Sequence, residues 1–154
     1  MLNQVEIARQ RWGGASNTID NWLDERKQLL IQYCHLAGVN YQSDHALPNE
    51  SEVNAFCALL MDYLSVGHFE VFEMLISDDD DGQALKQKLF PLISETTDLA
   101  LDFNDQFAEG YTPENTAVFE QAITKLGEAL IDRFELEDRL IQRMHGLVNN
   151  ELTD

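Results

Sequence analysis

Basic residues are scarce in this chain of 154 residues, in which 10 lysines and arginines stand against 28 aspartates and glutamates. The formal net charge is -18. A surface this acidic repels phosphate backbones and anionic lipid headgroups, so direct binding to nucleic acid or to a membrane is disfavoured. Basic protein partners are favoured, although acidity also serves simply to keep many proteins soluble.

Cysteines and signal-like segments are also few. Cys34 and Cys57 lie too far apart for a CxxC motif, and the polar N-terminus does not resemble a secretory signal. By inspection, no apolar run approaches the roughly 20 residues that span a bilayer. We therefore expect a cytoplasmic protein with free thiols. Its length and its 44% of hydrophobic residues predict one domain over residues 1–154.

Motifs of catalysis and metal binding are missing. None of His35, His45, His68 and His145 has an acidic residue three positions before it, the spacing by which helical bundles hold pairs of metal ions. A nucleophile elbow, a phosphate-binding glycine loop and a dinucleotide fingerprint are absent as well. We expect no enzyme, no cofactor and no metal site. A metal site assembled from different helices, or acid/base chemistry by His68 and a buried carboxylate, is the minority alternative.

Helical periodicity dominates the sequence, because apolar residues recur at steps of three and four along most of the chain. The two glycines of WGG, residues 12–14, predict an interruption, since each weakens a helix by roughly 1 kcal/mol. Pro91 predicts a kink, and Thr112, Pro113 and Glu114 together predict a helix start. The predicted helices cover residues 2–11, 16–38, 50–76, 83–108 and 113–149. This pattern predicts an all-α protein, an elongated antiparallel four-helix bundle with a short extra N-terminal helical segment.

The mostly apolar segment DYLSVGHFEVFEMLI, residues 62–76, contains Asp62, His68, Glu70 and Glu73. Asp62 lies on an otherwise apolar helical line, and Arg26 does so on an earlier helix. Buried charges are costly unless they are paired, so we expect a network between helices. Its predicted members are Arg26, Asp62, His68 and one of Glu135, Glu137 or Asp138. The network either only fixes the helix register or lines a groove or cavity in which a partner docks.

Three blocks of the sequence resemble the Rsd/AlgQ family, the regulators of sigma D. They are IDNWLDERKQLLIQY (19–33), DYLSVGHFEVFE (62–73) and RFELEDRLI (133–141), while RWGG (11–14) is closer to the AlgQ side. The resemblance covers nearly the whole chain in the same order. It implies a helical bundle that acts as an anti-sigma factor, binding the C-terminal, promoter-reading domain of the primary sigma factor and keeping that factor from RNA polymerase. It also implies that Asp62 corresponds to the family aspartate associated with sigma binding.

The resemblance agrees with the acidity of the chain, because the helix-turn-helix of that sigma domain must be basic to meet DNA phosphates. We expect a docking face with acidic residues, one histidine and two apolar anchors. The acids are Asp20, Asp24, Glu25, Asp62, Glu70 and Glu73, the histidine is His68, and the anchors are Trp22 and Phe69. For the two anchors, burial in the core is the stronger alternative. For Asp62 and His68, direct contact with the partner and support of the fold are equally favoured roles.

Two further partners stay open as alternatives. Members of the family have been linked to a phosphocarrier protein of the sugar phosphotransferase system and to control of an alarmone hydrolase, which would make the bundle an adaptor. A ligand sensor is the other alternative, in which a small molecule fills a polar cavity around Arg26, Asp62 and His68.

Overall fold

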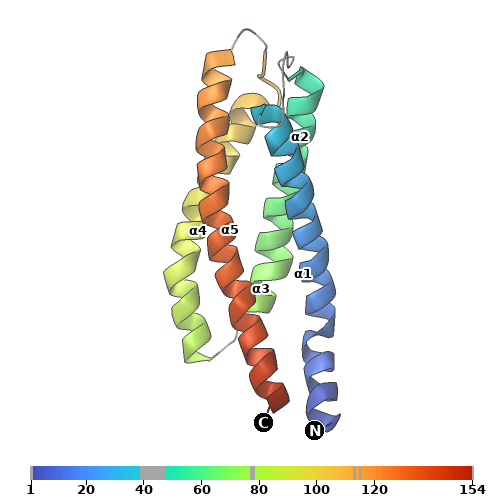
Figure 1. Cartoon of the computed structure of the whole chain (residues 1–154). Helices are drawn as coiled ribbons and strands as arrows, with labels where there is room; N and C mark the ends of the chain where they lie inside the picture. The colour runs from blue at the N-terminus through green and yellow to red at the C-terminus, as the bar shows by residue number, and fades with distance from the viewer. Residues whose placement is uncertain (1, 39–47, 77–78, 113, 115, 154) are drawn as a thin grey trace.

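Helices account for nearly every residue that the computed structural model describes, namely 2–38, 48–76, 79–112, 114 and 116–153. They are α1 (Leu2–Ala37), α2 (Glu50–Val66), the π-helical turn η1 (Gly67–Val71), α3 (Phe72–Leu75), α4 (Asp80–Phe107) and α5 (Thr116–Thr153). Because α2, η1 and α3 follow one another directly, the molecule consists of four long rods that run alternately up and down (Figure 1). Those described residues include no strand. The predicted all-α, elongated antiparallel bundle is confirmed.

The first rod differs from the prediction. α1 runs unbroken from Leu2 to Ala37, so the interruption predicted at residues 12–14 and the separate N-terminal segment are both wrong. Each glycine destabilises a helix by only about 1 kcal/mol. The contacts of α1 with α2 and α5 compensate for this loss, so the helix continues through the two glycines. Gly38 follows the helix with a φ of 73°, the left-handed conformation that favours glycine.

The second rod begins at a side-chain cap and contains a π-helical turn. The Asn49 side chain accepts a hydrogen bond of 2.8 Å from the backbone N–H of Glu52, as expected for an N-cap. Gly67 opens η1 where α1 comes close, since a Cβ atom at this position would lie 3.1 Å from Cζ2 of Trp22. An alanine here would require the Trp22 ring to move by a few tenths of an ångström.

The last two rods shift from their predicted starts. α4 begins at Asp80 rather than at residue 83, because Asp79 accepts a hydrogen bond of 2.8 Å from the backbone N–H of Gly82. Pro91 lies inside α4, on its exposed side. α5 begins at Thr116 rather than at residue 113, and Pro113 of the predicted start lies outside the described residues.

The core fills the space between the four rods with the apolar residues that recur at three- and four-residue steps. The largest of its fully buried apolar side chains are Trp22, Leu29, Phe56, Leu60, Tyr63, Leu75, Leu89, Phe107, Leu126 and Leu140. Aromatic rings from different rods contact one another, as in the edge-to-face pair of Phe56 and Phe103, whose ring centroids are 6.0 Å apart. Such pairs add to the free energy of burial.

Within the helical run Glu50–Leu75, a window of 18 residues has a mean hydropathy of 1.3, so the run is long and apolar enough to cross a membrane by length and composition alone. The expectation that no run approaches a membrane span is therefore wrong for this segment. In the bundle, Val53, Phe56 and Leu60 of this run are buried, whereas Asp62 is exposed. The high hydropathy of this segment is therefore explained by the apolar face that it buries in the core of the bundle.

Candidate partner-binding groove

A groove of about 620 Å³ separates α1 from the rod formed by α2, η1 and α3. We call it the acidic groove; its lining residues are Thr18, Asn21, Trp22, Glu25, Val66, Phe69, Glu70, Glu73 and Met74. On both walls these residues are mostly three or four positions apart, the spacing that places side chains on one face of a helix. Five of the predicted docking residues meet here: Trp22, Glu25, Phe69, Glu70 and Glu73.

The two predicted apolar anchors have different surroundings. Phe69 on η1 is 74% exposed, which leaves its ring available to a partner. Trp22 is 0% exposed, stacks on the Tyr63 ring with centroids 5.0 Å apart, and donates a hydrogen bond of 3.2 Å to the Tyr63 carbonyl. Trp22 is therefore part of the core at the floor of the groove, which is the alternative that the sequence favoured over a role as an apolar anchor. Met74, 37% exposed, is an apolar lining residue that the sequence reasoning missed.

The carboxylate of Glu25 is crowded by like charges. Glu25 is half-buried, and its Oε2 atom is buried without a hydrogen-bond partner among the residues that the structure describes. Burial is the main cause that raises the pKa of Glu25, and the negative charges of Asp62 and Glu70 raise it further. The three carboxylates therefore come from α1, α2 and η1 to one site.

The remaining predicted docking residues lie outside the lining of the groove. Asp62, His68, Asp20 and Asp24 are all exposed. The His68 ring packs edge-to-face against Phe69, with ring centroids 4.7 Å apart. The acids add negative charge around the groove, and whether any of them touches a partner stays a prediction.

A network of charged side chains joins α1, α2 and α5; Arg133 and Glu137 are buried, Arg26 is partly buried and the Asp138 side chain is 50% exposed. Arg26 donates hydrogen bonds to Glu137 (Nη2 to Oε1, 3.1 Å), to Asp138 (Nη1 to Oδ1, 2.7 Å) and to the Tyr63 hydroxyl (3.0 Å). The Tyr63 hydroxyl donates to the same Oε1 of Glu137 at 2.5 Å. Arg133 donates to Oε2 of Glu137 at 3.0 Å, and these two residues are 1% and 0% exposed. We call these five residues the charged network.

The charged network differs from the predicted one. Arg26, Glu137 and Asp138 belong to it, but Asp62, His68 and Glu135 are exposed. The reason is helical geometry: successive residues point about 100° apart, so Tyr63 rather than Asp62 faces α5. The predicted ligand cavity was to be lined by Arg26, Asp62 and His68. In the structure, Arg26 belongs to the charged network, whereas Asp62 and His68 are exposed.

Sequence reasoning also missed the second arginine of the charged network. Arg133 donates to the hydroxyls of Thr96 (3.0 Å) and Thr97 (2.7 Å) on α4. One signal could have found it, because Arg133 and Glu137 are four residues apart and so share one helix face. The tyrosine and the threonines carry no such signal.

The donors of the charged network match an ionised carboxylate. Burial raises the pKa of Glu137, whereas Arg133, Tyr63 and Arg26 lower it. Its two oxygens receive hydrogen bonds from two guanidinium groups and one hydroxyl, and this set of donors suits the ionised carboxylate, which is an acceptor only. Burial also disfavours the charge of Arg26, but Tyr63, Asp138 and Glu137 outweigh it and raise its pKa. The arginine is further held between aromatic rings, 4.7 Å from that of Phe134 and 5.4 Å from that of Trp22.

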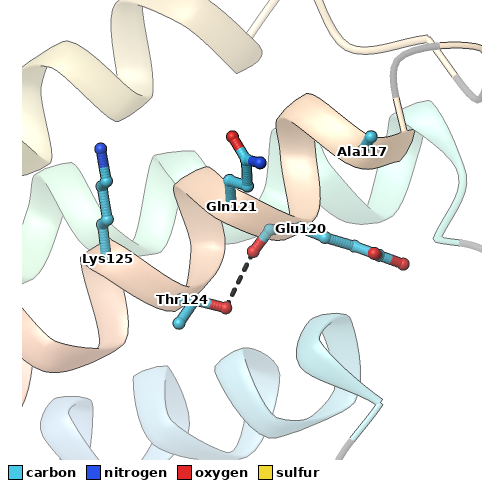
Figure 2. Close-up of a pocket in the computed structure, with 5 residues that line it drawn as sticks. All are labelled: Ala117, Glu120, Gln121, Thr124 and Lys125. Atoms are coloured by element: carbon cyan, nitrogen blue, oxygen red, sulfur yellow. Dashed lines mark hydrogen bonds between the residues drawn. The ribbon is translucent and has the colours of Figure 1, made fainter.

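Other hollows lie on α5. Figure 2 shows one of about 480 Å³, in which Gln121 and Lys125 point the same way while Glu120 points away from them. A neighbouring hollow of about 380 Å³ between α4 and α5 also includes Lys125. Neither gathers charges of one sign as the acidic groove does. Within the part of the chain that the structure describes, no group of three or more potential ligands from His, Cys, Asp and Glu could hold a metal ion.

Comparison with known proteins identifies relatives over nearly the whole chain. The family described as "Regulator of RNA polymerase sigma(70) subunit, Rsd/AlgQ" matches residues 1–145. The regulator of sigma D of Yersinia enterocolitica is 38% identical over 148 residues, which cover 92% of this chain and 89% of that protein. The regulator of sigma D of Salmonella paratyphi B is 39% identical over 145 residues, with 92% and 90% covered.

Proposed function

This chain belongs to the Rsd/AlgQ family of regulators of the RNA polymerase sigma(70) subunit, and we propose that it is an anti-sigma factor. It binds the C-terminal, promoter-reading domain of the primary sigma factor and sequesters that factor from RNA polymerase in the cytoplasm. The observation that carries the proposal is the family match over residues 1–145, together with relatives named regulators of sigma D. Its action is binding rather than catalysis.

The chemistry of the acidic groove supports this function. A helix-turn-helix that reads a promoter carries basic residues for DNA phosphates, and a chain with a net charge of -18 attracts such a domain. Charge complementarity raises the rate of association, while apolar anchors supply much of the affinity. The groove offers both, because Glu25, Glu70 and Glu73 line it beside the exposed ring of Phe69.

A titration of the purified chain with the isolated C-terminal domain of its host's primary sigma factor tests the proposal. We expect one-to-one binding in the micromolar range or tighter, weaker at high salt because the attraction is electrostatic. Asp62→Ala should weaken binding and reduce its salt dependence. Phe69→Ala should weaken binding by about 1–2 kcal/mol without changing the salt dependence. Asp98→Ala, at an exposed acid on α4, is the matched control and should bind as wild type does.

Each of these side chains is exposed, so circular dichroism should show unchanged helicity for all three variants. Absence of binding at every salt concentration, by a folded wild-type chain, would exclude the sigma domain as partner. The same titration with the phosphocarrier protein would then be the next experiment. Equal losses in Asp62→Ala and Asp98→Ala would show that only the overall charge matters.

A further inference from the structure

The Glu25 carboxylate is held in the acidic groove in an unsatisfied state. Its Oε2 atom is buried, yet it accepts no hydrogen bond from the described residues. Buried polar atoms in proteins are normally hydrogen-bonded, and an unpaired one costs free energy. Asp62 and Glu70 add like charges beside it. A donor with a positive charge, brought by another molecule, would relieve both the missing hydrogen bond and the repulsion.

The shape of the groove restricts what that molecule is. One wall extends from Thr18 to Glu25 and the other from Val66 to Met74, which is about two helical turns, or roughly 11–12 Å, on each side. Two turns of a partner's helix fit this length. The exposed ring of Phe69 lies on the same wall as Glu70 and Glu73, so apolar and acidic contacts are available side by side.

The charges of the groove restrict it further. Its lining residues include three glutamates and no lysine, arginine or histidine. Elsewhere in the described residues, three of the chain's own arginines are paired with other acids: Arg26 and Arg133 with Glu137, and Arg143 with Asp79. An arginine is the best complement, since its guanidinium can donate two parallel hydrogen bonds to one carboxylate. A lysine would supply the same charge.

We propose that Glu25 is a specificity-determining residue, which receives an arginine or lysine side chain from a helix of the bound sigma domain. Phe69 and Met74 contact the apolar residues beside it on that helix. The inference rests on the proposed function and narrows it to one contact. A protein side chain is favoured over a metal ion, because the part of the chain described here holds no group of potential metal ligands and an ion would leave the exposed ring of Phe69 without a contact from the bound partner.

Glu25→Gln tests the contact, with Glu95→Gln as its matched control. Both substitutions remove one negative charge and keep the side-chain shape, and Glu95 is an exposed residue of α4 outside the groove. Against the sigma domain, Glu25→Gln should raise Kd about tenfold or more, because a desolvated charge pair is lost. Glu95→Gln should change Kd by less than about twofold, since exposed charges contribute little.

The pH dependence of binding gives a second readout. Glu25 faces carboxylates on three other elements, Asp62 on α2, Glu70 on η1 and Glu73 on α3. Acidification protonates Glu25 and removes the acceptor charge, so wild-type affinity should fall more steeply than that of Glu25→Gln. The ratio of the two affinities should approach one at acidic pH. A ratio that stays constant would show that Glu25 does not receive the cation.

Double-mutant cycles identify the partner side chain. Each lysine and arginine of the sigma domain is replaced by alanine and titrated against wild type and Glu25→Gln. One of them should show a coupling of at least about fivefold in Kd. If wild type binds but Glu25→Gln binds equally well, or if no basic residue is coupled to Glu25, the inference is wrong and the proposed function stands.

Two other outcomes are distinguishable. If wild type does not bind the sigma domain at all, the proposed function fails, and the inference fails with it. Calcium titration of the free chain checks for an inorganic cation. Saturable binding of Ca²⁺ that Glu25→Gln abolishes would assign the carboxylate to a metal ion and overturn the inference.

Discussion

Glu25 and Arg26 are neighbours on α1, yet they lie in opposite electrostatic surroundings. Arg26 points to α5, where the charged network pairs it with Glu137 and Asp138. Glu25 points into the acidic groove, where Asp62 and Glu70 repel it and its Oε2 atom has no partner among the described residues. A step of one residue, about 100° around the helix, separates a satisfied charge from an unsatisfied one.

Carboxylates inside the bundle are paired with cations, whereas carboxylates at the groove repel one another. Inside the bundle, Glu137 is paired with two arginines and a tyrosine, since an unpaired charge at 0% exposure would destabilise the chain by about 3–5 kcal/mol. At the groove, solvent screens part of the repulsion, so the bundle tolerates it. The charged network therefore serves folding, whereas the charge of the groove remains unpaired at Oε2 of Glu25 among the described residues, as the proposed contact with a partner requires.

The largest effect is expected where the charged network is broken. Glu137→Ala leaves Arg26 and Arg133 without their shared carboxylate, so the free energy of unfolding should fall by about 3–5 kcal/mol. Urea denaturation followed by circular dichroism measures it. Glu135→Ala, two residues earlier and exposed, should change stability by less than about 0.5 kcal/mol. Similar values for the two variants would remove the distinction between network and surface.

A smaller effect is expected at the Tyr63 hydroxyl, which connects Arg26 and Glu137 in the charged network. Tyr63→Phe keeps the ring that stacks on Trp22 but removes the donor to Glu137 and the acceptor for Arg26. Stability should fall by about 1–2 kcal/mol, the contribution of hydrogen bonds to charged groups. The same denaturation experiment applies. A loss as large as that of Glu137→Ala would mean that the ring, rather than the ion pairs, holds the network together.

The smallest effect on the free energy of unfolding is expected for Glu25→Gln in the acidic groove, where the substitution should stabilise the chain rather than destabilise it. Because the folded state raises the pKa of Glu25 above its ordinary value of 4.5, the native chain binds a proton more readily than the unfolded chain. Stability contributed at this site is therefore present below pH 4.5 and is lost as pH rises through the raised pKa. Glu25→Gln should be more stable than wild type by a few tenths of a kcal/mol at pH 7.

Thermal unfolding of both proteins from pH 4 to pH 7 measures this difference. The advantage of the variant should vanish below the ordinary pKa of the carboxyl, where wild type is protonated in both states. A variant less stable than wild type at pH 7 would show that the Glu25 charge is compensated in the free protein. The contrast with Arg26 would then be lost.

The periodicity of the sequence predicted the rods well but not their ends. The apolar steps through Phe56 and Leu60 gave the correct buried face, because one face of each helix must enter the core. The break at residues 12–14 was wrong, because the packing of α1 against two neighbours outweighs a local preference of about 1 kcal/mol per glycine. The resemblance to the Rsd/AlgQ family is confirmed by the match over residues 1–145.

The candidate site was predicted only in part. Trp22, Glu25, Phe69, Glu70 and Glu73 do line one groove, and Trp22 forms its buried floor. Asp62 was predicted to belong to the buried network because the residues on the same side of its helix are apolar. In the structure, Asp62 lies at the border of this apolar face and is exposed to solvent. An apolar stripe gives the direction of the core only to within a residue or two.

Composition and periodicity by themselves determined that this chain is helical and acidic, because these properties depend on residue type and on spacing along one helix. Only the tertiary structure decided which acids are satisfied. Glu137 and Glu25 are the same residue type on amphipathic helices. The spacing of four residues places Arg133 beside Glu137, but no local pattern indicates that Arg26 of another helix also reaches Glu137 or that Oε2 of Glu25 lacks a partner among the described residues. That difference arises where the rods meet, since pairing between helices depends on their rotation and register against one another.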